Sequence, residues 1–169
     1  MSFFKKLGRF SDKNWYAPLI ALFAGLDAFL FIIPIETLLL PSVILKPKRW
    51  WTSAIWVALG SAVGATFLAH VVSVHGEGYI IHSFPKLYHS KEWTHSVNIM
   101  QDYGAWALAG IALSPIPQQP AAAFSGLVKT PLVEVFSAIL LGRALKYLAL
   151  CWFASRARLL FEKSRLTHP

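Results

Sequence analysis

The chain has 169 residues, of which 56% are hydrophobic and only 14% are charged, with seven Trp and twelve Phe. This composition is typical of a chain surrounded by lipid and excludes an ordinary soluble domain. The formal net charge of +8 does not indicate nucleic acid binding, because the basic residues flank apolar segments, where they set membrane orientation and meet anionic headgroups. The single cysteine, Cys151, excludes an internal disulfide and a cysteine-based zinc site.

The apolar regions predict an all-α integral membrane protein with one membrane domain, 1–169, since each crossing takes about 20 apolar residues. Its expected parts, in chain order, are an amphipathic N-terminal helix (1–14), a re-entrant hairpin (15–45), a transmembrane helix (50–74), an interfacial, extracytoplasmic segment (75–102), a second re-entrant hairpin (103–128), a second transmembrane helix (131–155) and a basic cytoplasmic tail (156–169).

The first apolar region is too long for one straight crossing. Its 31 residues would extend roughly 46 Å as a helix, whereas the hydrocarbon core is roughly 30 Å thick. Pro34 and Pro41 interrupt helical hydrogen bonding, and Glu36 between them is costly in lipid unless it faces protein or water. We therefore expect the chain to enter from the cytoplasm, turn near Pro34 to Pro41 and return to Lys46 on the same side.

The second half of the chain repeats this pattern. Pro34 matches Pro115 with an offset of 81 residues, and Gly60 matches Gly142 with an offset of 82. A hairpin makes no net crossing and the helix after it makes one, so two such units in series have inverted topology. This predicts two inverted-topology repeats whose hairpin tips meet near the middle of the membrane.

The distribution of basic residues predicts which ends are cytoplasmic. Under this topology eleven Lys and Arg flank the inner face, and three flank the outer face. The inner residues are Lys5, Lys6, Arg9, Lys13, Lys46, Lys48, Arg49, Arg156, Arg158, Lys163 and Arg165, and the outer ones are Lys86, Lys91 and Lys129. Because positive residues concentrate on the cytoplasmic side, both termini are predicted to be cytoplasmic.

Two acidic residues in the first hairpin are candidates for proton or ion coupling. Glu36, at the tip, either carries a proton during transport or caps frayed backbone donors. Asp27 lies nine residues earlier in an apolar helix, where an unpaired charge is expensive. We expect it to face the protein interior, as a second proton site or as a structural partner of Arg143 or His70.

Arg143 and Lys146 are candidate substrate-binding residues. They stand three residues apart on one face of an apolar helix. Arg offers a bidentate fork and Lys a point charge, so the pair is spaced to share one lipid phosphate. Structural pairing with Asp27 and Glu36 is the alternative, and both roles are compatible if headgroup and carboxylates compete for the same cations.

The second hairpin tip adds four candidate substrate-binding residues, Pro115, Pro117, Gln118 and Gln119. Unpaired N–H groups at a half-helix end suit a phosphate oxygen or an ion. The two glutamines equally suit hydrogen bonding to the hairpin backbone.

Glycines and histidines are expected to have structural roles. Gly60, Gly64 and Gly142 keep helix faces small and are predicted to allow close helix packing. The histidines of the interfacial segment recur at spacings of seven, seven and six, whereas metal-binding pairs normally sit three to five apart. No metal site is predicted from His75, His82, His89 and His95, and the segment is expected to form a lid.

Several short motifs, in order, resemble those of the DedA superfamily, also called the VTT or SNARE-associated Golgi protein family, and in particular its small bacterial YqaA-like branch. The resemblance covers residues 27–147. The motifs are Asp27 ahead of Pro34-Ile35-Glu36, then Lys46-Pro47-Lys48-Arg49-Trp50, Gly60-Ser61-x-x-Gly64, Tyr103-Gly104-Ala105-Trp106 through Ser114-Pro115-Ile116-Pro117 to Ser125-Gly126, and Gly142-Arg143-x-x-Lys146-Tyr147.

The resemblance implies a multi-pass protein of the bacterial cytoplasmic (inner) membrane that moves lipids between leaflets, as flippase or scramblase, often with the proton motive force. It places the functional groups on Asp27, Glu36, Arg143 and Lys146. The branch usually has an aromatic residue and then Lys where this chain has Gln118 and Gln119. The substrate is therefore expected to be less anionic or differently held.

The predicted function is transport of a phospholipid or polyprenyl phosphate in support of envelope homeostasis. The expected partners are a lipid with an anionic or zwitterionic headgroup and a proton or sodium ion, but no nucleic acid, and a homo-oligomer is compatible with the chain. The alternatives are a small ion-coupled solute transporter or channel, distinguished by whether its cavity opens to lipid or only to water, and a structural partner-binding protein. No enzyme activity and no cofactor are expected, since nucleophile elbows and H-E-x-x-H motifs are missing from the sequence.

Overall fold

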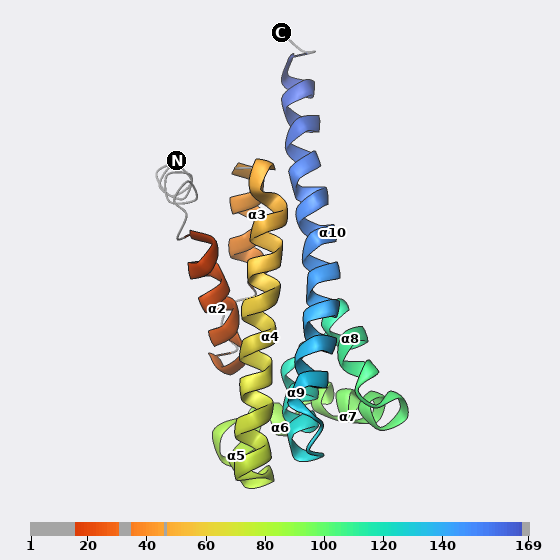
Figure 1. The fold of residues 1–169 in the computed structure, drawn as a ribbon. Helices are drawn as coiled ribbons and strands as arrows, with labels where there is room; N and C mark the ends of the chain where they lie inside the picture. The colour runs from red at the N-terminus through yellow and green to blue at the C-terminus, as the bar shows by residue number, and fades with distance from the viewer. Residues whose placement is uncertain (1–15, 31–34, 46, 167–169) are drawn as a thin grey trace.

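The computed structural model describes residues 16–30, 35–45 and 47–166, and every regular element in these ranges is a helix (Figure 1). The elements are α2 (Tyr16–Leu30), α3 (Glu36–Leu45), the 3-10 turn η1 (Pro47–Arg49), α4 (Trp50–His75), α5 (Glu77–Ser83), α6 (Pro85–Tyr88), α7 (Lys91–Tyr103), α8 (Trp106–Leu113), α9 (Gln119–Leu127) and α10 (Leu132–Leu166). The predicted N-terminal amphipathic helix and Pro34 lie outside the described residues.

Two long apolar helices, α4 and α10, pack against each other along the centre of the molecule (Figure 1). The segments Pro47–His75 and Leu132–Arg156 are long and apolar enough to cross a membrane. The predicted spans 50–74 and 131–155 fall within these segments, apart from Pro131. Helix α10 continues to Leu166 through most of the predicted basic tail, because residues 156–166 contain no Gly or Pro and are rich in good helix formers.

Helices α2 and α3 run in opposite directions beside the long helices (Figure 1). Helix α2 packs on α4, whereas α3 packs mainly on α10. The predicted turn at Pro34 to Pro41 is too long, because α3 begins at Glu36 and continues through Pro41. Proline costs this short helix one backbone hydrogen bond, but burial of Leu39 and Val43 on either side of Pro41 stabilises the helical conformation.

The second pair of short helices, α8 and α9, also reverses the chain. An irregular turn over residues 114–118, here called the 114–118 turn, separates them. Its first residue stabilises it locally, since Ser114 Oγ accepts a hydrogen bond from the Ile116 N–H at 3.1 Å. Pro120 does not prevent helix formation because it lies in the first turn of α9, where its missing N–H has no intrahelical partner to lose.

The packing partners of the four short helices follow one rule. The first helix of each pair packs on the long helix that follows it in the chain, α2 on α4 and α8 on α10. The second packs on the other long helix, α3 on α10 and α9 on α4. The second short helix of each half of the chain therefore packs on the long helix of the other half.

Glycines allow the closest helix contacts. A Cβ built on Gly60 would lie 1.9 Å from Ala21 O of α2, and one on Gly64 would lie 2.2 Å from Gly25 O. In the second half, a Cβ on Gly142 would lie 2.4 Å from Ala109 O of α8. All three distances lie below van der Waals contact, so only glycine fits these crossings.

Helices α5, α6 and α7 lie together at one end of the bundle (Figure 1). Helix α7 is amphipathic and buries Trp93, Ser96 and Met100, and the Ser90 Oγ caps it by accepting from the Trp93 N–H at 3.1 Å. His75, His82, His89 and His95 are all exposed and are distributed over α4, α5, the end of α6 and α7. Within the described ranges, no three His, Cys, Asp or Glu residues group to hold a metal ion.

Substituting Gly64 by Ala is expected to destabilise the fold, because the new methyl group would force the α2 and α4 backbones apart. Overpacking of this kind costs about 1–3 kcal/mol. The measurement is the thermal unfolding midpoint of the purified protein in detergent. Gly110→Ala is the matched control, because a Cβ at this exposed helical glycine meets nothing within 4 Å. An equal midpoint for the two variants would contradict the proposed constraint.

Candidate functional site

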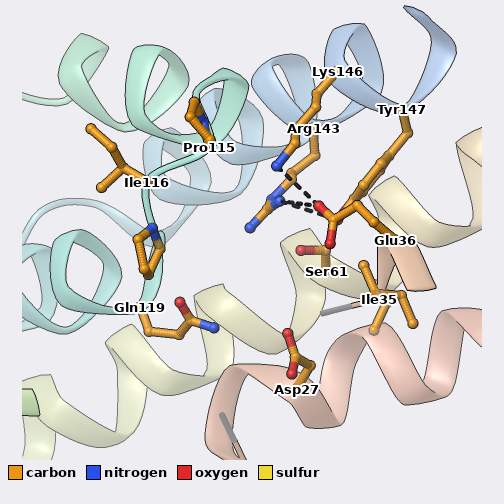
Figure 2. A pocket seen from close by; sticks show the side chains of 12 residues that line it. Asp27, Ile35, Glu36, Ser61, Pro115, Ile116, Gln119, Arg143, Lys146 and Tyr147 are labelled. Atoms are coloured by element: carbon orange, nitrogen blue, oxygen red, sulfur yellow. Dashed lines mark hydrogen bonds and ion pairs between the residues drawn. The ribbon is translucent and has the colours of Figure 1, made fainter. Parts of the chain in front are cut away.

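A cavity of about 250 Å³ lies between the short helices and the two long helices (Figure 2). It separates two apolar clusters: one contains Ala58 of α4 and Tyr147 of α10, the other Ala62 and Ile139. Its lining side chains come from α2, Ile35 and the start of α3, α4, α9, α10 and the 114–118 turn. They are Ala24, Asp27, Ile35, Glu36, Ser61, Pro115, Ile116, Pro117, Gln119, Arg143, Lys146 and Tyr147.

One side of the cavity carries an ion-pair cluster. Lys146 Nζ lies 3.0 Å from Glu36 Oε1, and Arg143 Nη1 lies 3.8 Å from the same oxygen (Figure 2). The three side chains are only 10–26% exposed. Removing such charges from water is costly unless they are paired. The two ion pairs therefore hold the start of α3 against the middle of α10.

Tyr147 supports the two cations from the next turn of α10. Its hydroxyl accepts a hydrogen bond from Arg143 Nη1 at 3.1 Å. The centroid of its ring lies 5.5 Å from Arg143 Cζ and 6.0 Å from Lys146 Nζ. Because the Tyr147 side chain is fully buried, its ring is fixed, and both cations gain a cation–π contact.

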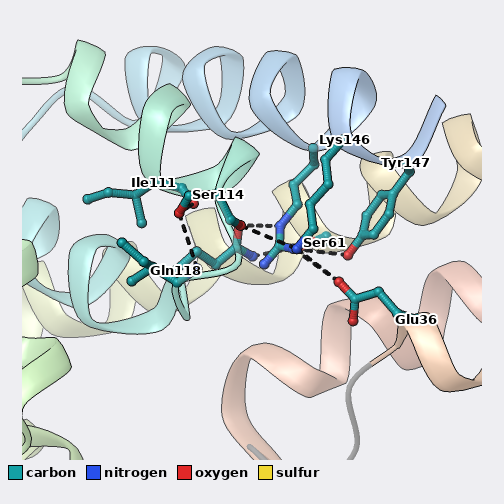
Figure 3. A network of polar contacts seen from close by, with 9 residues as sticks. Glu36, Ser61, Ile111, Ser114, Gln118, Lys146 and Tyr147 are labelled. Atoms are coloured by element: carbon teal, nitrogen blue, oxygen red, sulfur yellow. Dashed lines mark hydrogen bonds and ion pairs between the residues drawn. The ribbon is translucent and has the colours of Figure 1, made fainter. Parts of the chain in front are cut away.

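Gln118 connects three parts of the structure (Figure 3). Its Nε2 donates to Ser61 Oγ of α4 at 2.8 Å, and its Oε1 accepts from Arg143 Nε of α10 at 2.7 Å. The residue is 3% exposed, so both bonds are formed away from water. Gln118 therefore positions the Arg143 guanidinium. Neither predicted role for this residue, ligand contact or bonding to the hairpin backbone, describes these two bonds.

The 114–118 turn is also held at its other end. Lys146 Nζ donates to the Ser114 carbonyl oxygen at 3.3 Å (Figure 3). Two cations of α10 thus contact the two ends of the turn, Lys146 at Ser114 and Arg143 at Gln118.

The opposite side of the cavity carries Asp27 and Gln119 (Figure 2). Gln119 is 8% exposed, and its Oε1 is buried without a hydrogen-bond partner. Asp27 shares the cavity with Arg143, one of its two predicted partners, whereas the other, His70, is exposed and lies outside the lining. The charged residues of the lining are two acids and two cations, so the formal charge of these four side chains is zero.

The structure brings most predicted site residues together. Asp27, Glu36, Pro115, Pro117, Gln119, Arg143 and Lys146 line the cavity, and Gln118 lies directly behind it. The predicted packing residues Gly60, Gly64 and Gly142 are outside the lining and lie at helix crossings. Ser61, Ser114 and Tyr147 belong to the site but were not predicted from the sequence as site residues. Only Tyr147 gave a usable signal, its position one helical turn after Arg143.

The family model of the VTT domain matches residues 33–156. No curated protein and no solved structure matches the chain. Membership of the YqaA-like branch stays a prediction. Because the matched segment spans well over half of the sequence, the chain belongs to the VTT-domain, or DedA, family of membrane proteins.

Proposed function

We propose that this protein moves a phosphate-bearing lipid, a phospholipid or a polyprenyl phosphate, between the leaflets of the bacterial inner membrane. One observation carries the proposal: Arg143 and Lys146 meet Glu36 in a cavity between two chain reversals, where the three side chains are 10–26% exposed. Ionisable groups at such a depth in an apolar bundle are expensive and usually mark a transport path. The proposal requires neither a cofactor nor a chemical reaction on the lipid.

We further propose that each short helix pair is a re-entrant hairpin and that the two halves are inverted-topology repeats. The exchange of second short helices between halves supports this, because a two-fold axis between α4 and α10 produces such a pattern. Irregular backbone at membrane depth is tolerated only where it is buried or lines a wet cavity. The 114–118 turn fits this condition because Pro115, Ile116 and Pro117 line the cavity.

The charges suggest how a headgroup binds. A phosphate offers Arg143 a bidentate partner and Lys146 a point-charge partner, and it competes with Glu36 for both cations. When the phosphate displaces Glu36, the carboxylate loses its ion pairs in a site of low dielectric. Proton uptake by Glu36 then becomes favourable. This couples headgroup binding to a proton, with Asp27 as a second candidate for the proton or for a sodium ion.

Uptake of a small soluble ion is the second candidate function. A cavity of about 250 Å³ lies slightly below the usual range of about 300–1,000 Å³ for ligand pockets. It therefore suits a headgroup or a free phosphate rather than a whole lipid. A lipid requires that its acyl chains stay outside the cavity, so only the lipid proposal requires a lateral opening toward the bilayer.

The central prediction concerns Glu36. Purified protein in vesicles is expected to move a labelled phospholipid or polyprenyl phosphate across the bilayer under an imposed proton gradient, and Glu36→Gln is expected to abolish this movement. Gln keeps the side-chain volume but neither pairs electrostatically with Lys146 nor carries the proton. The measurement is the fraction of labelled lipid accessible to an impermeant quencher over time.

Glu134→Gln serves as the matched control, because Glu134 is an exposed carboxylate in the first turn of α10, outside the cavity lining. It should retain the wild-type rate, and the thermal midpoint of each variant verifies folding. Vesicles that take up radiolabelled inorganic phosphate but move neither lipid would favour the solute transporter. Equal rates for Glu36→Gln and wild type would refute the assigned role of Glu36.

The proposed topology also makes a prediction, testable with cysteines introduced into a Cys151→Ala background. Asn98 in α7 and Lys48 in η1 are both exposed; η1 directly precedes α4, whereas α7 lies with α5 at the other end of the bundle (Figure 1). We expect an impermeant maleimide to label Asn98→Cys in spheroplasts. Lys48→Cys should react only after the membrane is permeabilised, since the basic end lies in the cytoplasm. Labelling of both positions in intact spheroplasts would exclude a membrane crossing by α4.

A further inference from the structure

A second hollow lies on the other side of the 114–118 turn. This groove has a volume of about 540 Å³ and is formed by the end of α5, by α6 and by the start of α7, with Pro117 as the contribution of the turn. Pro117 also lines the central cavity. The turn is therefore a wall shared by the two hollows.

The turn is bonded at its two ends to Lys146 and Arg143 of α10, and Gln118 is also bonded to Ser61 of α4. Lys146 Nζ donates to the Ser114 carbonyl at 3.3 Å, and Arg143 Nε donates to Gln118 Oε1 at 2.7 Å. These bonds act at the two ends of the turn, whose backbone is irregular. Two of the side-chain bonds that hold the turn thus come from Lys146 and Arg143.

A phosphate that binds the cations would weaken this hold. Hydrogen bonds from Lys or Arg to a phosphate join two opposite charges, so they are stronger than those to the neutral carbonyl of Ser114 or the amide of Gln118. A ligand that takes these donors away from the turn favours the arrangement in which the turn is released. Headgroup binding and movement of the wall are therefore linked through the same two side chains.

The lining of the groove suits part of a lipid. Phe84, Leu87 and Pro117 supply apolar surface, and exposed Lys86 supplies a cation for a phosphate. Glu92 also lines the groove, so the formal charge of its lining is zero. Because the groove offers one cation and the cavity offers two, phosphate binding in the groove should be weaker than in the cavity, as release requires.

We propose that the groove is a second binding station for the phosphate-bearing headgroup and that the 114–118 turn is the gate between it and the cavity, opened when phosphate captures Lys146 and Arg143. The inference rests on the proposed function. It assigns the groove to the end of the path on the side of α5–α7.

The test is the accessibility of a cysteine at position 24, in a Cys151→Ala background. Ala24 lines the cavity and is 3% exposed, so the closed gate should protect it. An impermeant maleimide is added to spheroplasts, which present the outer face. Short-chain phosphatidic acid should accelerate labelling, whereas the matched short-chain diacylglycerol, which lacks the phosphate, should not. Equal rates with both additions would overturn the phosphate trigger.

A second variant opens the gate without ligand. Lys146→Met loses the hydrogen bond to Ser114, which should raise the labelling rate about tenfold, the population shift expected for one hydrogen bond to a charged group. Glu36→Gln loses the ion pair but keeps the Lys146–Ser114 bond, so its labelling should stay low. A similar rise in Glu36→Gln would assign the effect to the ion pair and overturn the gate.

The route through the groove is tested by filling it. Leu87→Trp in the Lys146→Met protein should return labelling to the closed rate, because Leu87 lines the groove. Ile81→Trp is the matched control, since Ile81 is an exposed residue of α5 outside the groove lining. Undiminished labelling in Leu87→Trp would overturn the assignment of the groove.

Failure of this inference is distinguishable from failure of the proposed function. Labelling requires no lipid movement, so a gate that opens in Lys146→Met and is blocked by Leu87→Trp stands even if vesicles move no lipid. Conversely, normal lipid transport with unchanged labelling rejects the gate alone.

A transport measurement adds one check: Lys86→Gln should slow lipid movement, and Lys91→Gln, outside the groove lining, should not.

Discussion

The need to pair two cations inside an apolar bundle determines much of this structure. Arg143 and Lys146 lie in the middle of α10, where neither can remain charged without a partner. Their partners come from two separate segments, Glu36 at the start of α3 and the 114–118 turn between α8 and α9. Satisfying these two charges therefore brings both chain reversals to the same level of the bundle.

Close helix packing fixes the frame in which this pairing occurs. Gly60 and Gly64 let α2 approach α4 to backbone contact, and Gly142 does the same for α8 against α10. In each long helix the glycine lies next to a polar site residue, Ser61 after Gly60 and Arg143 after Gly142. One face of each helix thus meets a neighbouring backbone while the adjacent face supplies the cavity, so a shift at a glycine would move the site.

The sequence predicted the two long helices, the chain reversals and most of the cavity because these leave local signals. Apolar length predicts α4 and α10, proline in an apolar run predicts a reversal, and an ionisable residue in such a run predicts a buried site. The extent of the first turn was predicted wrongly, since tertiary packing carries α3 through Pro41. The bridge from Ser61 through Gln118 to Arg143 could not be predicted, because it joins residues 57 and 25 positions apart in sequence by packing alone.

Gln119 leaves the charges of the cavity lining balanced. The resemblance to the YqaA-like branch implies a lysine at position 119, which would add a third cation to this lining. With Gln119, two acids face two cations, and their formal charge is zero. An anionic phosphate that enters this neutral site leaves one negative charge uncompensated, which is costly at low dielectric. Protonation of a carboxylate removes that cost, whereas with a third cation no proton would be needed. Under the proposed function, glutamine rather than lysine at this position would make proton uptake a condition for binding an anionic headgroup, while a zwitterionic headgroup would bind without it.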